Sequence, residues 1–182
     1  DALRDKTDSY WRFLLSGETV TWRDEIAGEI NVRTSVVSDP ILVKGNGQFL
    51  YTLASVIDDS DFGVTDVVRG IDHLTNTAVQ IEIFRNLSAG LPVFGHHSLI
   101  VDNSGENFSK RSGSLSIKSL KEAGIEAGAI VSKLVSLGTG DGLDFKNNIN
   151  ELTAKFELNK YSTAPVKFEK EVLQTISRKL IA

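Results

Sequence analysis

Short apolar runs separated by turn residues dominate the first part of the chain. Three of them are rich in β-forming residues: Tyr10–Leu15, Thr19–Trp22 and Pro40–Val43. Ser-Gly, Gly28 and Ser-Asp-Pro interrupt them, which predicts a small strand-rich region. In the turn over residues 44–48, two glycines flank an asparagine, and all three tolerate positive φ. We therefore expect a tight hairpin between Ile41–Val43 and Phe49–Tyr51.

From residue 64 the pattern changes to strand, helix and strand. Val64, Val67 and Val68 suit a buried strand that Gly70 ends, and Asp72 lies where a helix N-cap would fall. Helical spacing follows at Leu74, Ala78, Ile81 and Leu87. The apolar residues of Leu91–Phe94 and Ser98–Val101 indicate a second strand. This order is typical of a right-handed parallel unit, so we predict a doubly wound α/β fold, of which the chain holds about half.

The last third of the chain is predicted to be helical. One helix is expected over Ile117–Leu137, with Gly138 ending it and a turn-rich linker following. Two more helices, Ile149–Phe156 and Glu169–Leu180, are expected on either side of Pro165. These segments predict a helical second domain.

Composition narrows the class of protein. The 182 residues contain no Cys, which excludes disulfides and thiolate metal sites, and three His cannot alone supply the usual four-ligand zinc centre. No apolar run approaches the roughly 20 residues that span a bilayer, and residues 1–10 do not form a signal-like segment. A cytoplasmic protein without membrane contact is therefore expected. Because the chain opens on Asp and contains no Met, we expect a piece of a longer protein.

The net charge of −4 gives no global attraction to nucleic acid, although residues 155–182 carry six Lys or Arg against three Glu. This local surplus fits either an RNA contact or an ordinary solvated helical surface. Gly95 precedes His96 and His97, which face opposite sides of a strand and so cannot easily bind one ion. We expect neither histidine to take part in chemistry.

Two other features are candidates for chemistry. Arg69 falls where the strand after residue 64 runs out, and ligands of open parallel sheets bind at that edge. Its fork of donors suits a carboxylate or a phosphate, but it could equally pair with one of the nearby acids, Asp58, Asp59, Asp61 and Asp66. The second feature is the polar, glycine-bearing loop over residues 103–113, in which Lys110 could face a triphosphate or lie on an ordinary surface.

Four motifs in unbroken order resemble one family. Val67–Thr77 reads V-V-R-G-I-D-H-L-T-N-T, and Asn107–Arg111 reads N-F-S-K-R. They resemble V-I-R-G-E-D-H-L-S-N-T and K-L-S-K-R of class I glutamyl-tRNA synthetases. Phe49–Asp66 is similar to the family's P-T-Y-N-F-A-V-V-I-D-D and the D-x-G-I-T-H segment after it. Phe156–Phe168 resembles the F-D-L-x-R-x-S-x-S-P-A-x-F that opens the stem-contact fold, which favours the bacterial branch.

The resemblance implies a fold and a division into domains. Residues 1–38 would end an acceptor-binding (connective) insertion, 39–116 would form the second half of a Rossmann-like catalytic domain, and 117–182 would begin a helical stem-contact domain. The implied activity is ATP-dependent ligation of glutamate to tRNA through glutamyl-adenylate. ATP would enter with Mg²⁺, no bound zinc is expected, and the partners would be glutamate, ATP and tRNA.

The resemblance also implies roles for individual residues of the site. Lys110 matches the catalytic lysine that stabilises the ATP phosphates, and Tyr51 and Arg69 match the positions that hold glutamate. The residues matched to ATP binding are Asn107, Phe108, Ser109, Lys110, Arg111 and Asp72.

Several positions depart from the family pattern. Asn107 replaces a lysine, Ile71 replaces a glutamate, and Thr52 stands where asparagine is common. The H-I-G-H-type motif and the anticodon-binding region are absent from this sequence, so we expect no glutamate activation by these residues alone. Two other hypotheses stay open: an RNA-contact module, and a paralogue that charges another tRNA, such as the glutamine acceptor.

Overall fold

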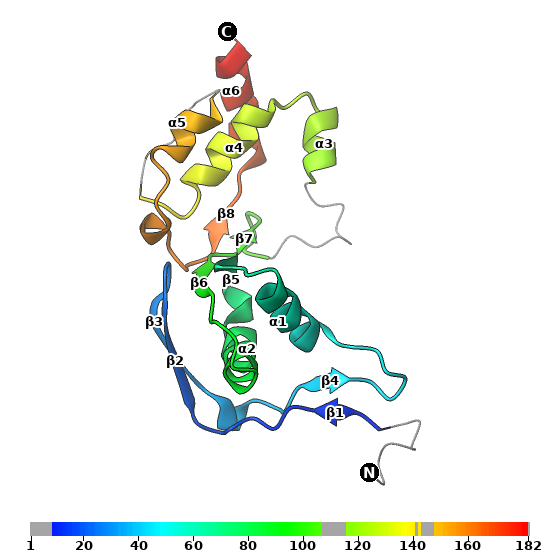
Figure 1. Cartoon of the computed structure of the whole chain (residues 1–182). Helices are drawn as coiled ribbons and strands as arrows, with labels where there is room; N and C mark the ends of the chain where they lie inside the picture. Colours follow the sequence, from blue (N-terminus) through cyan, green and yellow to red (C-terminus); the bar gives the residue numbers. More distant parts are fainter. Residues whose placement is uncertain (1–8, 107–115, 141, 143–147, 182) are drawn as a thin grey trace. The chain divides into compact units, whose positions relative to one another are not determined.

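The structure is a computed structural model that describes residues 9–106, 116–140, 142 and 148–181 (Figure 1). It divides into two compact units, Asp1–His96 and His97–Ala182, each described here by itself. Asn107, Phe108, Ser109, Lys110 and Arg111 lie outside the described residues. The expected functional boundaries at residues 38 and 116 stay predictions.

The first unit contains a four-stranded sheet with the order β3-β2-β6-β5. Its strands are β2 (Thr19–Asp24), β3 (Gly28–Arg33), β5 (Asp66–Gly70) and β6 (Val93–His97). β2 and β3 form an antiparallel hairpin, and β2 meets β6 in parallel where Asp24 lies opposite Phe94. β5 and β6 are neighbours in the sheet, as the strand–helix–strand pattern predicts.

Two helices and a two-stranded ribbon complete this unit. The helices are α1 (Tyr51–Asp61) and α2 (Leu74–Asn86), with short 3₁₀ turns at Thr34–Val36 and Ile71–His73. The ribbon pairs β1 (Trp11–Arg12) with β4 (Ile41–Val43) in antiparallel fashion. All residues of α2 from Thr77 to Phe84 are buried, so this helix is the centre of the core.

The core of this unit combines apolar packing with the buried carboxylate of Glu82. Val20, Val56, Ile81 and Phe84 belong to its buried cluster. Within α2, the Glu82 side chain accepts hydrogen bonds from the backbone and hydroxyl of Ser16, at 2.8 and 2.9 Å, and from the Thr34 hydroxyl at 2.7 Å. These bonds attach the segment before β2 and the end of β3 to the helix.

The second unit is mainly helical. Its helices are α3 (Ile117–Glu122), α4 (Ala127–Ser136), α5 (Ile149–Thr153) and α6 (Lys170–Ile181), with a 3₁₀ turn at Leu158–Lys160. Two short parallel strands, β7 (Ile100–Val101) and β8 (Val166–Lys167), accompany them. Leu120, Ala129, Phe168, Leu173 and Ile176 contribute to its buried cluster.

The α/β fold class is confirmed, but five local predictions need correction. Phe49 alone bridges to Val43, and Tyr51 begins α1 instead of extending a strand. Asp72 is not an N-cap, because it lies in a 3₁₀ turn and α2 begins after His73. Val68 is 50% exposed, so the predicted strand is only partly buried.

The remaining two corrections concern element boundaries. The helix expected over residues 117–137 is two helices, because Gly124 between them has a φ of 73°, which interrupts the helical backbone. The second predicted strand is also divided, since β6 ends at His97 and β7 pairs with β8 in another sheet. In the described part of the chain, no helix combines the length and the apolar character that a membrane span requires.

Candidate functional site

Arg69 lies next to the end of β5 and is half-buried, with two side chains of α2 in front of it. One of its terminal nitrogens, Nη2, donates to Gln80 Oε1 at 2.7 Å and to Thr77 Oγ1. The Phe94 ring lies 5.8 Å from the guanidinium carbon, a distance that allows a cation–π contact. The Arg69 Nε atom is buried and has no hydrogen-bond partner among the described residues.

The acids near Arg69 do not neutralise it by direct contact. The two acceptors of its Nη2, Thr77 and Gln80, are neutral side chains, and in the described residues Arg69 forms no ion pair with Asp58, Asp59, Asp61 or Asp66. Burial lowers the pKa of Arg69, and the nearby Tyr51 and Asp59 act in the opposite direction. Since a guanidinium is not deprotonated in proteins, the site holds a positive charge, and its Nε donor has no partner among the described residues.

A series of buried, hydrogen-bonded side chains continues from Thr77 to His96 and Asp24. The Thr77 hydroxyl lies 2.7 Å from His96 Nε2, and His96 Nδ1 lies 2.5 Å from Asp24 Oδ2. The exposed fractions of Thr77, His96 and Asp24 are 0%, 0% and 2%. The second carboxylate oxygen of Asp24 accepts backbone hydrogen bonds from Ile26, Ala27 and His96, which fix it where β2 turns into β3.

The protonation states of this chain follow from its surroundings. Burial raises the pKa of Asp24, but hydrogen bonds from Ala27, His96 and Ile26 outweigh burial, so that the pKa is lowered overall. Burial lowers the pKa of His96, and the Asp24 carboxylate offsets this only in part. A carboxylate can only accept, so the proton of the neutral imidazole is on Nδ1, and Nε2 accepts the Thr77 hydroxyl proton.

An Asp–His–Thr series resembles a nucleophile with its base, but the surroundings of Thr77 exclude that role. Its hydroxyl is fully buried, and its oxygen already accepts a hydrogen bond from Arg69. A nucleophile needs an accessible oxygen that its base can activate, whereas a cation that binds the oxygen lowers its reactivity. The series of hydrogen bonds that starts at Asp24 therefore ends at Arg69.

The other expected glutamate residue, Tyr51, lies on the same side of the unit. It is the first residue of α1, is 57% exposed, and raises the pKa of Arg69 by charge and hydrogen bonding. Ser55, one helical turn further along, accepts a hydrogen bond of 2.6 Å from Gln80 Nε2. The structure thus places Tyr51 near Arg69, and the partners of Arg69 belong to a network that the sequence did not reveal. Asp72 is exposed in its 3₁₀ turn.

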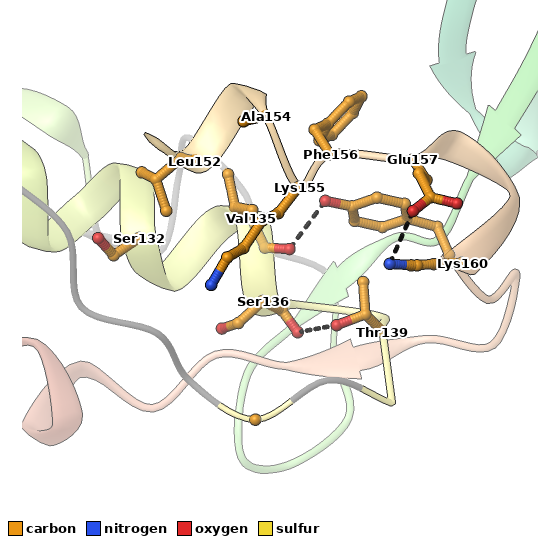
Figure 2. Close-up of a pocket in the computed structure, with 12 residues that line it drawn as sticks. Ser132, Val135, Ser136, Thr139, Leu152, Ala154, Lys155, Phe156, Glu157 and Lys160 are labelled. Atoms are coloured by element: carbon orange, nitrogen blue, oxygen red, sulfur yellow. Dashed lines mark hydrogen bonds and ion pairs between the residues drawn. The ribbon is translucent and has the colours of Figure 1, made fainter. Parts of the chain in front are cut away.

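A separate cavity of about 440 Å³ lies within the second unit, between α4, α5 and the 3₁₀ turn that precedes β8 (Figure 2). The Tyr161 hydroxyl on its wall donates to the Val135 carbonyl at 2.8 Å, and Lys160 pairs with Glu157 at 2.9 Å. These polar groups of the cavity wall already bind other groups of the protein. Arg69, whose Nε has no partner among the described residues, is therefore the stronger candidate for a ligand site. In the parts of the chain that the structure describes, no group of three or more His, Asp or Glu residues is placed to hold a metal ion.

The lowered pKa of His96 predicts a loss of stability in mild acid. Unfolding returns the pKa of this histidine to about 6.5, so that below this pH the unfolded state binds a proton that the folded state rejects. We expect the free energy of unfolding to fall by up to about 1.4 kcal/mol for each pH unit below about 6.5. The measurement is denaturant unfolding of the full-length protein between pH 5.5 and 7.5. His96→Gln should flatten this dependence, and His97→Gln is the control that should preserve it. An unchanged pH dependence in His96→Gln contradicts the prediction.

A comparison with known protein families shows to which family the chain is related. The family model described as tRNA synthetases class I (E and Q), catalytic domain, matches residues 6–175. The chain belongs to this family. The class I synthetase resemblance of the four motifs is therefore confirmed.

Individual relatives agree with this membership. A glutamate–tRNA ligase 2 of Ruegeria sp. is 44% identical over 177 residues, which are 97% of this chain and 40% of the relative. A glutamate–tRNA ligase 1 of Roseobacter denitrificans is 42% identical over 183 residues, which are 100% of this chain and 42% of the relative. The chain thus spans about two fifths of the length of the synthetases that it matches.

Solved structures share the fold. A glutamate tRNA ligase from Elizabethkingia meningosepticum, crystallised in complex with its amino acid, superposes with a TM-score of 0.79 and 24% identity. The superposition covers 91% of this chain and 37% of that one. The α/β fold described above is therefore that of the corresponding part of a class I synthetase.

Proposed function

We propose that the chain is part of an enzyme that ligates glutamate to tRNA at the expense of ATP, and that Arg69 and Tyr51 bind the amino acid. The observation that carries this proposal is the half-buried guanidinium held by two neutral side chains, Thr77 and Gln80. Its Nε donor is buried without a partner among the described residues. A carboxylate at this position would complete the hydrogen bonds of the fork and neutralise its charge.

The reaction has two steps. A carboxylate oxygen of glutamate attacks the α-phosphorus of ATP, which gives glutamyl-adenylate and releases pyrophosphate. The 3′-terminal hydroxyl of tRNA then takes the glutamyl group and releases AMP. Both steps depend mainly on positioning and on cations that face the developing charge. Arg69 would orient the amino acid, Mg²⁺ would accompany ATP, and Lys110 would stabilise the phosphates as the catalytic residue.

The residues proposed to bind ATP are identified from the family motif. Asn107, Phe108, Ser109, Lys110 and Arg111 would close over ATP. Asp72, whose side chain is exposed, would approach the ribose or the amine of the nucleotide. The replacement of the motif's first lysine by Asn107 removes one positive charge, so the loop would attract ATP less strongly than the family pattern does.

The choice of tRNA is the second part of the proposal. The glutamate acceptor is the first candidate, because relatives matched over nearly the whole chain carry the name glutamate–tRNA ligase. Ile71 and Asn107 depart from the family pattern within two of its motifs, which makes the glutamine acceptor the second candidate. Separate charging assays with the two purified acceptors distinguish them.

The test of the proposed function is charging of tRNA with labelled glutamate by the full-length protein. We expect glutamate to become attached to tRNA only when ATP is present. The 182-residue chain, assayed in parallel, should give no charging because it lacks the H-I-G-H-type motif that class I synthetases use for ATP. Turnover by the chain alone would refute this second expectation, and an inactive full-length protein would refute the first.

A further inference from the structure

We propose that Asp24, His96 and Thr77 are positioning residues that hold the Arg69 guanidinium in the orientation needed to receive the amino-acid carboxylate. This inference rests on the proposed function, because it assumes that Arg69 binds a carboxylate. It adds three residues to which the family motifs assign no role in the site, although Thr77 is the last residue of the Val67–Thr77 motif. They come from the end of β2, from β6 and from α2.

The direction of the hydrogen bonds explains how Asp24, His96 and Thr77 act on Arg69. Asp24 fixes the His96 proton on Nδ1, and His96 Nε2 therefore takes the only hydroxyl proton of Thr77. The lone pairs of the Thr77 oxygen are then directed to Arg69 Nη2. Without the histidine, the same hydroxyl could donate to the His73 carbonyl, 3.2 Å away, and its lone pairs would be free to rotate away from Arg69.

A second acceptor completes the fixation. Gln80 lies three residues after Thr77 on the same face of α2 and also accepts from Nη2, at 2.7 Å. Two acceptors on one nitrogen define the plane of a guanidinium, because the group is rigid and flat. With Nη2 held in this way, Nε is the donor left without a hydrogen-bond partner among the described residues.

Asp24 also supplies a negative charge near Arg69 without binding the nitrogens of its guanidinium. The Asp24 carboxylate acts on Arg69 electrostatically, although the two side chains are separated by His96 and Thr77. A direct Asp–Arg contact would be bidentate and would compete with the carboxylate of the substrate. A neutral imidazole and a hydroxyl placed between them keep the negative charge near the cation and leave the donors open.

A purely structural role explains this arrangement less well. Burial of a carboxylate and an imidazole costs desolvation free energy, and apolar side chains of similar volume often stabilise a core as well or better. Trp22 and Phe94 already pack near the His96 ring, with centroid distances of 6.2 and 6.5 Å. An apolar residue in place of His96 would therefore meet suitable neighbours.

The experiment compares Thr77→Val with Thr77→Ser in the full-length protein. Valine has nearly the shape of threonine but no hydroxyl, whereas serine keeps the hydroxyl. We expect Thr77→Val to raise the KM for glutamate in tRNA charging by about tenfold, the loss expected for one hydrogen bond to a charged group. Thr77→Ser should stay within about threefold of wild type, and the KM for ATP should be unchanged in both variants. Equal effects of Val and Ser, or equal effects on glutamate and ATP, would overturn the proposal.

A reference variant and a spectroscopic measurement separate the possible failures. If Arg69→Ala leaves the KM for glutamate unchanged, the proposed function fails and takes this inference with it. If Arg69→Ala raises this KM while Thr77→Val does not, only the positioning role fails. In ¹H–¹⁵N spectra of the wild-type protein, assigned with Arg69→Lys, a held guanidinium gives separate signals for its two terminal nitrogens. A single averaged signal would overturn the positioning role even if Thr77→Val does not fold.

Discussion

Arg69→Ala in the full-length protein should raise the glutamate concentration for half-maximal tRNA charging by about 100-fold. A bidentate, charge-assisted pair contributes roughly 3 kcal/mol, and alanine removes both donors. Arg69→Lys should recover only a small part of the loss, because an ammonium group lacks the planar fork that Thr77 and Gln80 hold. The measurement is the KM for glutamate at saturating ATP and tRNA.

The matched control for this prediction is Arg85→Ala. Arg85 lies on the same helix as Thr77 and Gln80 but is exposed, so its removal should leave the KM for glutamate within about twofold of wild type. Circular dichroism should show that all variants are folded. If Arg69→Ala and Arg85→Ala behave alike, Arg69 does not bind the substrate.

Lys110→Ala should lower kcat by about 100-fold with a smaller effect on the KM for glutamate. A cation that faces charge developing on the phosphates stabilises the transition state more than the ground state, and loss of one such group costs about 10²–10³ in rate. The measurement is steady-state charging at saturating glutamate and tRNA. Lys110→Arg keeps the charge and should retain more activity than alanine.

Lys118→Ala is the control for the loop lysine. Lys118 has the same charge, is 85% exposed and makes only a surface ion pair with Glu122 at 3.9 Å. Such pairs contribute little, so this variant should charge tRNA at the wild-type rate. A Lys110→Ala enzyme with unchanged kcat would place residue 110 on an ordinary surface.

Periodicity predicted the elements whose apolar spacing is regular. α2 is the clearest example, because Leu74, Ala78 and Ile81 follow helical spacing and its central residues form the core. The sequence did not predict α1, whose first residue continues an apolar run from Phe49. That segment is helical because Val56 is fully buried against the core, a tertiary contact that local spacing does not express.

The single helix predicted over residues 117–137 shows a different kind of error. The apolar stripe that supported it has a gap between Leu120 and Ile130. Gly124 lies in that gap with positive φ, and Ile125 after it is buried in the core of the second unit. A glycine inside a helical pattern costs only about 1 kcal/mol, so its presence alone does not reveal a break.

The site was predictable only in part, for a related reason. The rule that ligands bind at strand ends selected Arg69, and the family motif added Tyr51. Thr77 and Gln80, which hold Arg69, are near it in sequence, but Asp24 and His96, which complete the network, are 72 residues apart. The pattern around His96 and His97 predicts chemistry for neither residue, and a buried histidine that positions another side chain has no local sequence signature. Such networks depend on tertiary contacts that leave no local pattern.

Arg69 and the side chains that hold it are the proposed glutamate-binding part of a tRNA-charging enzyme. The most direct measurement is ATP-dependent attachment of labelled amino acid to tRNA by the full-length protein, with glutamate and glutamine compared at equal concentration. We expect attachment of glutamate and little or none of glutamine, because the proposed Arg69 site receives the side-chain carboxylate, which glutamine replaces by a neutral amide. Equal attachment of both amino acids, or attachment of neither, would contradict it.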